Sequence, residues 1–192
     1  MDLYTVRAWV LLGLYILPSS GLAEWQCTGP FGGSADIIRV ARSNPQLVVS
    51  AARNGLIHRS LDSGANWSRI PFTNEHGSIL HALEIDPTDA NRWYAGVEGG
   101  SERVSGVYLT IDGGQTWSRL SEIAGKVIWS IAVWQKDPNI VVAGAADGIY
   151  KSSDRGKTWA RISPEANKAL QPVVSLALDP LDPQVIYAGT TH

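Results

Sequence analysis

The sequence predicts an all-β fold built from a repeated unit of four short strands. A motif of a hydroxyl residue, Asp, Gly and Trp occurs three times, at 60–67, 110–117 and 152–159. Between these motifs, short runs rich in Val, Ile, Tyr and Trp alternate with Asn-Pro, Asp-Pro and Gly turns, as is typical of strands. Beyond the first residues, no window keeps the 3.6-residue spacing of an amphipathic helix.

Residues 1–23 have the pattern of a secretory signal peptide. Arg7 precedes an apolar run from Ala8 to Leu17, and small residues stand before a cleavage predicted after Ala23. The run is shorter than the roughly 20 residues that a membrane-spanning helix needs. We therefore expect a secreted or periplasmic protein with no stable membrane span after cleavage. The alternative is an uncleaved N-terminal anchor.

The composition limits the function classes that remain. The 192 residues fit one domain, which we expect at 24–192. The 18 acidic and 16 basic residues nearly cancel and do not cluster, so nucleic acid is not expected as a partner. Cys27 is the single cysteine, and the four histidines show no ligand spacing. We therefore expect no internal disulfide, no metal site and no cofactor.

Each unit contains four segments in the same order. A first strand ends in an Asn-Pro or Asp-Pro turn, a second strand of small apolar residues follows, and a third strand leads into the motif. The side chains expected to close the first turn of each unit are Asn44, Asp86, Asp137 and Asp179. The expected units span about 37–70, 79–120 and 127–162, with part of a fourth at 173–192. This repeat length is typical of propeller blades.

The motif is expected to form a hairpin turn between the third and fourth strands. Its Asp accepts hydrogen bonds across the turn, its Gly allows a positive φ, and its Trp lies between neighbouring sheets. Truncating a buried aromatic side chain costs about 3–5 kcal/mol, against roughly 1 kcal/mol for one turn hydrogen bond, so Trp burial should dominate. The residues assigned to this structural role are Ser60, Asp62, Gly64, Trp67, Thr110, Asp112, Gly114, Trp117, Ser152, Asp154, Gly156 and Trp159.

The pattern Ser/Thr-x-Asp-x-Gly-x-Thr/Asn-Trp resembles the Asp-box, or bacterial neuraminidase repeat, family. Asn66 stands where the family usually has Thr. The resemblance covers about Trp25 to His192. It implies a β-propeller of four-stranded antiparallel blades with one Asp-box hairpin per blade, here three complete blades and part of a fourth, as a partial or small propeller. The family includes sialidases, xyloglucan-cleaving glycoside hydrolases, sortilin-type receptors and photosystem II assembly factors, so it does not fix the function.

The ligand site is expected on the face opposite the Asp-boxes. In a propeller, the loops from the second to the third strand and from one blade to the next emerge on that face, and recognition often resides in such loops. The loops of this kind span 71–78, 97–106, 121–126 and 163–172. The candidate ligand contacts are Glu75, His76, Glu98, Glu102 and Arg103.

No catalytic residue is assigned. Ser68-Arg69-Ile70-Pro71 looks like the Arg-Ile-Pro motif of sialidases, but it follows the first box, and Arg69 aligns with Arg119 and Arg161 at the start of a fourth strand. The loop glutamates form no recognisable pair, as two-carboxylate glycoside hydrolysis requires.

We therefore expect an exported bacterial scaffold that binds a protein, peptide or glycan ligand without catalysis. A fragment of a xyloglucanase-like hydrolase is the alternative, and a sialidase is a less favoured one. Unpaired blade edges also predict self-association.

Overall fold

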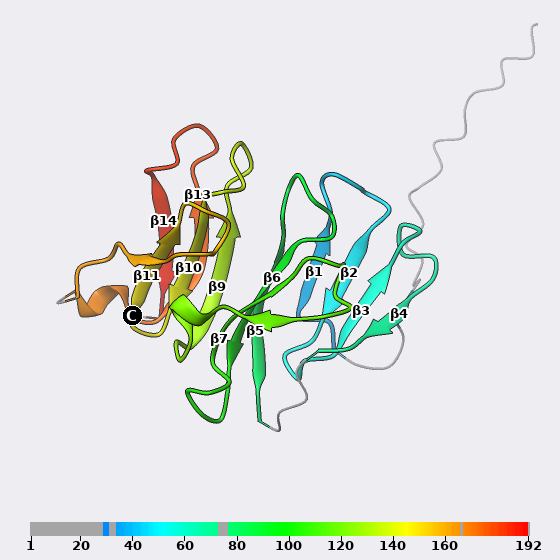
Figure 1. Cartoon of the computed structure of the whole chain (residues 1–192), viewed down its shortest axis with the longest axis horizontal. Helices are drawn as coiled ribbons and strands as arrows, with labels where there is room; N and C mark the ends of the chain where they lie inside the picture. Colours follow the sequence, from blue (N-terminus) through cyan, green and yellow to red (C-terminus); the bar gives the residue numbers. More distant parts are fainter. Residues whose placement is uncertain (1–28, 31–33, 73–76, 166, 192) are drawn as a thin grey trace, which may run out of the picture.

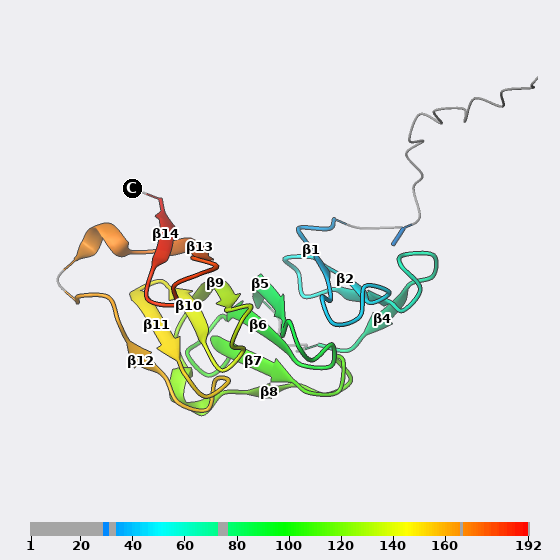
Figure 2. The same ribbon diagram turned by 90° about the horizontal axis from the view of Figure 1, so that it is seen from above.

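The described chain is almost entirely β-structure. The computed structural model describes residues 29–30, 34–72, 77–165 and 167–191, and the predicted signal peptide at 1–23 lies outside them. Three four-stranded antiparallel sheets and one two-stranded sheet follow one another in an arc (Figure 1, Figure 2). The predicted fold class, with three complete blades and part of a fourth, is confirmed. In this part of the chain, no helix is long and apolar enough to cross a membrane.

Each complete blade contains its strands in chain order, each hydrogen-bonded to the next. The first blade contains β1 (Ile37–Val40), β2 (Val48–Ala51), β3 (Ile57–Ser60) and β4 (Ser68–Ile70). The second contains β5 (Ile79–Ile85), β6 (Trp93–Glu98), β7 (Gly106–Thr110) and β8 (Ser118–Arg119). The third contains β9 (Ile128–Val133), β10 (Val141–Ala145), β11 (Gly148–Ser152) and β12 (Ala160–Arg161). The partial fourth contains β13 (Val173–Leu178) and β14 (Ile186–Thr190). Two short 3-10 helices, η1 (Ser121–Ile123) and η2 (Lys168–Leu170), lie in the connections between blades.

The turn between the first and second strands is closed by a side chain in every blade. In each case the backbone N–H two residues further along donates to the Asn or Asp side chain, as predicted from the sequence. The N···O distances are 3.3, 2.8, 3.0 and 2.7 Å for Asn44, Asp86, Asp137 and Asp179.

Each of the three Asp-boxes has the same pattern of hydrogen bonds, and the second box illustrates it. The Thr110 hydroxyl donates to Asp112 Oδ1 at 2.7 Å and accepts from the Gly114 N–H at 3.0 Å. The Thr116 N–H and hydroxyl donate to the two carboxylate oxygens of Asp112 at 2.9 and 2.6 Å. Gly114 has a φ of 92°, which a side-chain-bearing residue adopts only with strain.

Asn66 preserves this network in the first box. Its backbone N–H donates to Asp62 Oδ1 at 2.8 Å, and its side-chain amide donates to Asp62 Oδ2 at 2.7 Å. The amide therefore replaces the hydroxyl that Thr116 supplies in the second box. The departure from the usual Thr changes the donor and leaves both bonds to the carboxylate in place.

These hydrogen bonds favour the charged form of the box carboxylates. They lower the pKa of Asp62, Asp112 and Asp154 from the ordinary value of 3.8 to about 2. For Asp112 and Asp154 the largest contribution to the lowered pKa is the hydroxyl of the following Thr, and for Asp62 it is the backbone N–H of Asn66. The folded state therefore holds these three carboxylates ionised to lower pH than the unfolded chain does.

We expect the boxes to make the protein sensitive to acid. Because the folded pKa lies below the unfolded value, this stabilisation is fully present above about pH 4 to 5 and is lost as the pH falls towards about 2. Asp112→Asn should lower the free energy of unfolding at pH 6 and flatten its decline between about pH 4 and 2, measured by urea denaturation. Asp182→Asn, at an exposed turn outside the boxes, is the control. An unchanged slope for Asp112→Asn would contradict this account.

Consecutive blades pack through one recurring pair of positions. The first residue of each second strand lies opposite the hydroxyl residue of the box, as Trp93 lies opposite Thr110. The first residue of each second strand faces the preceding blade. The second residue of the same strand faces the following blade, because side chains alternate along a strand. The pairs that share a core cluster across a blade boundary are Val49 with Trp93, Tyr94 with Val141, and Val142 with Ile186.

Two glycines allow the blades to approach closely. A Cβ atom at Gly96 would lie 2.8 Å from Cγ2 of Ile128, and one at Gly144 would lie 2.7 Å from Cγ1 of Val173. Ile128 and Val173 are the first residues of β9 and β13. We call the first strand of each blade its inner strand. The second strand of one blade therefore packs directly against the inner strand of the next.

The box tryptophans differ in their surroundings. Trp117 packs against the cluster between the first two blades, with its ring 4.8 Å from that of Phe72, and Trp159 packs against the next cluster. Trp67 donates its indole N–H to the Gly64 carbonyl at 2.9 Å, but it belongs to none of the three clusters formed by the described residues. The expectation that each Trp lies between two sheets therefore holds for the second and third boxes and not for the first.

This difference should appear in the stability of tryptophan variants. Trp159→Ala removes a ring packed between two blades and should lower the free energy of unfolding by about 3 kcal/mol. Trp67→Ala should cost closer to about 1 kcal/mol, because it mainly removes the hydrogen bond within its box. Chemical denaturation of both variants measures this. Equal losses would show that the tryptophans act within their boxes and not between blades.

Candidate functional site

The Asp-boxes and the turns after the first strands lie at the same end of the sheets. The N–H groups of the residues at 63, 113 and 155 donate to the backbone carbonyls of residues 46, 91 and 139 at 2.9, 2.9 and 3.0 Å. The turns after the first strands point upward in Figure 1. The loops from second to third strands and the connections between blades lie at the opposite end, which we call the loop face. This agrees with the separation of faces expected from the sequence.

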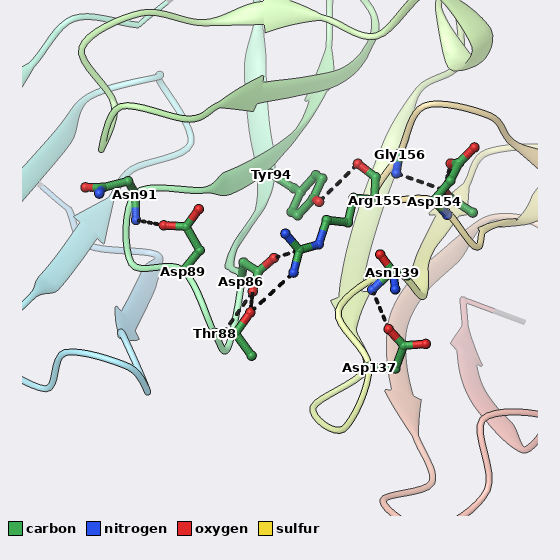
Figure 3. A network of polar contacts seen from close by, with 11 residues as sticks. Asp86, Thr88, Asp89, Asn91, Tyr94, Asp137, Asn139, Asp154, Arg155 and Gly156 are labelled. Atoms are coloured by element: carbon green, nitrogen blue, oxygen red, sulfur yellow. Dashed lines mark hydrogen bonds and ion pairs between the residues drawn. The ribbon is translucent and has the colours of Figure 1, made fainter.

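The polar contacts at the box end join the second and third blades (Figure 3). Nε of Arg155 lies 3.9 Å from Oδ2 of Asp86, whose side chain is fully buried, and Nη2 lies 3.5 Å from the Thr88 hydroxyl. The Tyr94 hydroxyl donates to the Arg155 carbonyl at 3.1 Å, and burial raises the pKa of Tyr94. These contacts bind the third box to the turn of the preceding blade, which is a structural role.

A hollow of about 460 Å³ opens at the loop face, where the inner strands begin. All three complete blades and the partial fourth contribute to its wall. We call it the loop-face hollow and define it by its lining residues, which are Asp36, Ile37, Arg53, Leu80, His81, Trp129, Val174 and Thr191.

Three of the lining residues stand at β-bulges in equivalent strands. The register of β5 against β6 shifts between Leu80 and Ala82, which leaves His81 as the extra residue. Trp129 in β9 and Val174 in β13 are unpaired in the same way. A bulge bends the strand and re-aims the extra side chain, and bulges are common next to functional sites. The same irregularity thus places one side chain from each of three blades at the hollow.

The polar groups of the hollow centre on His81. Its side chain is 4% exposed, and its Nε2 lies 2.7 Å from Oε2 of Glu98. Its Nδ1 lies 3.4 Å from Nη2 of Arg53. Because a guanidinium group only donates hydrogen bonds, Nδ1 is the acceptor in the contact with Arg53, and Nε2–H donates to Glu98. The backbone N–H of Arg53 in turn donates to Asp36 at 2.9 Å.

An aromatic surface lies beside these polar groups. The rings of His81 and Trp129 are 4.1 Å apart at their centroids and tilted by 37°. Nε1 of Trp129 is buried and has no hydrogen-bond partner in the described part of the chain. The hollow therefore combines the ring of Trp129 against that of His81, the exposed guanidinium group of Arg53, and the Asp36 carboxylate, with Glu98 behind His81.

The ligand contacts predicted from the sequence do not all lie near the loop-face hollow. Glu98 does not line the hollow but contacts His81, which does. Glu102 and Arg103 are exposed in the loop after β6 and do not line the hollow, and the Glu102 carbonyl accepts from Arg119 at 2.9 Å. Glu75 and His76 lie outside the described residues. These contacts remain predictions.

Sequence reasoning missed the residues that line the hollow. None of His81, Trp129 and Arg53 is marked by a motif in the sequence. The signal that could have found them is the alignment of the repeats. Leu80-His81-Ala82, Ile128-Trp129-Ser130 and Val173-Val174-Ser175 keep an apolar residue before and a small residue after a central position that varies.

The geometry does not assemble the other chemistries considered from the sequence. Arg69 is exposed on β4, the outermost strand of its blade, where it pairs with His58 of β3, and not at the hollow. In the described ranges, no group of three or more His, Cys, Asp or Glu residues is arranged to hold a metal ion.

Comparisons with known proteins support the fold. Residues 108–119 match the model of the BNR/Asp-box repeat, so the chain contains an Asp-box repeat as its sequence indicates. No curated protein sequence matches the chain.

Several solved structures have a similar fold. An ancestral GH74 enzyme superposes with a TM-score of 0.64 at 22% identity, over 80% of this chain and 21% of that enzyme. YCF48 bound to a D1 peptide gives 0.54 at 18% identity, over 76% of this chain and 44% of YCF48. The computationally designed Ika4 protein gives 0.57 at 21% identity, over 88% of this chain and 94% of Ika4. The chain thus has the fold of these β-propeller proteins and spans about a fifth of the GH74 enzyme.

Proposed function

We propose that this protein is a non-catalytic scaffold that binds a protein, peptide or glycan segment in the loop-face hollow. The observation that carries the proposal is the hollow itself, into which bulged inner strands of three blades place one side chain each. Exposed loops and strand ends held by a rigid fold commonly carry recognition. The predicted signal peptide adds that the binding takes place outside the cytoplasm.

The chemistry of the hollow suits recognition of an amphipathic group. Trp129, whose ring lies against that of the buried His81, offers an aromatic surface for a side chain or a sugar ring, and Arg53 offers guanidinium donors at the rim. Asp36 and Glu98 each accept a hydrogen bond from within the protein, which orients them as fixed acceptors. YCF48, which has a similar fold, is seen with a bound peptide, and this supports the peptide arm of the proposal.

Arg53→Ala tests the location of the site. Arg53 is exposed, so the substitution should leave the free energy of unfolding nearly unchanged. Ligands selected on peptide and glycan arrays with the full chain should bind the variant at least about tenfold more weakly by titration calorimetry. Arg42→Ala, an exposed arginine at the box end, is the matched control and should bind as the parent protein does. Equal affinity of Arg53→Ala and the parent would place the site elsewhere.

The hydrolase alternative has a separate test. A glycosidase needs one carboxylic acid and one carboxylate facing each other across the scissile bond. We expect the full chain to release no reducing sugar from xyloglucan and no sialic acid from a reporter substrate. Release that is lost in Glu98→Gln would overturn the proposal of a non-catalytic scaffold.

A further inference from the structure

Two apolar surfaces at the ends of the arc of blades are exposed although their counterparts inside the arc are buried. In β1, Ile38 is 59% exposed and Val40 is 58% exposed. The equivalent residues of the second blade, Leu83 and Ile85, are 0% and 8% exposed because the first blade covers them. The equivalence follows from register, since Val40 pairs with the first residue of β2 as Ile85 pairs with the first residue of β6.

The exposed residues of β1 point away from the second blade. Ile37 packs in the cluster between the first two blades, and Arg39 forms an ion pair with Glu84 of β5. Because side chains alternate along a strand, Ile38 and Val40 lie on the opposite side of the sheet. Together with Val48 they form what we call the leading face.

The other end of the arc carries the complementary surface. Tyr187 of β14 is 60% exposed, whereas its neighbours Ile186 and Ala188 pack against the third blade. Tyr187 is the second residue of a second strand, the position that Tyr94 and Val142 occupy in the preceding blades, where both are 0% exposed. We call Tyr187 and the exposed Ala177 of β13 the trailing face.

We propose that a second copy of this chain covers both faces. The same arrangement occurs three times within one chain, where the second residue of one second strand and the first residue of the next second strand belong to one apolar cluster. Tyr187 of one copy then packs against Val48 of the other as Val142 packs against Ile186. The trailing face fits the leading face because both repeat a packing that the chain uses between its own blades.

The repeat also sets the number of copies. The contact is head to tail, so it leads to a closed ring or to a growing filament. In their described residues, two copies have six complete and two partial blades, at the upper end of the four to eight blades of closed propellers, and a third copy would exceed that range. The inference is therefore a closed pair with two identical contacts. It goes beyond the proposed ligand binding and does not depend on it.

Mass measurement in solution tests the pair. Light scattering on the full chain, coupled to size exclusion, should give twice the mass of one chain. Ile38→Glu and Tyr187→Glu should each halve that mass, because each places a charge in both contacts. Both residues are exposed in the single chain, so each variant should keep the fold of the parent, which far-UV circular dichroism checks. Ile111→Glu is the matched control, since Ile111 is 62% exposed in the second box and belongs to neither face. Its mass should remain doubled.

Mixing the two variants tests the head-to-tail geometry. The Ile38→Glu chain keeps an intact trailing face and the Tyr187→Glu chain keeps an intact leading face, so an equimolar mixture should recover the doubled mass through one intact contact. A parent chain of single mass, or a doubled mass that none of the face variants changes, overturns the proposal. So does a mixture that stays at single mass while the parent is double, because the contact would then join like faces.

Discussion

Each blade of this protein is held against the next by apolar packing between its second strand and the sheet of the next blade. Tyr94 and Val141 illustrate the contact: both are fully buried, and they belong to one cluster although they lie on different sheets. Gly96 and Gly144 bring the sheets close enough for it. Burial of apolar side chains supplies most of the stabilisation, since the carboxylates of the boxes are exposed to water. The hollow exists because this packing aligns the starts of the inner strands at one end of the arc.

Most of the local structure could be predicted from the sequence because the partners lie close together along the chain. Asp112 bonds to residues two and four positions away, and Asp86 closes a turn over two residues. Such contacts form wherever the right residue types occur in order, so a repeated motif reveals them. The boxes, the Asx turns and the four-strand unit follow from that logic. Asn66 fits it as well, because its amide donates where a hydroxyl usually does.

The site was less accessible because it depends on contacts between distant segments. His81 meets Glu98, Arg53 and Trp129, each 17 or more residues away. Its position at a bulge arises from the register between β5 and β6, which no residue of β5 specifies alone. Glu98 is a predicted ligand contact because it stands at the start of a long loop, and the structure places it beside His81. Trp67 shows the opposite failure: its box is formed as expected, but burial of the ring requires a preceding sheet.

The repeated turns and the loop-face hollow occupy opposite ends of the blades. The box end carries repeated turns, whereas at the loop face the repeat places different side chains, His81, Trp129 and Val174, at equivalent positions. A double-mutant cycle on Tyr94→Leu and Val141→Ala, measured by chemical denaturation, tests most directly whether contacts between blades hold the fold. The account predicts a coupling energy of about 1 kcal/mol or more between the two substitutions. Losses that add to within about 0.3 kcal/mol would contradict it.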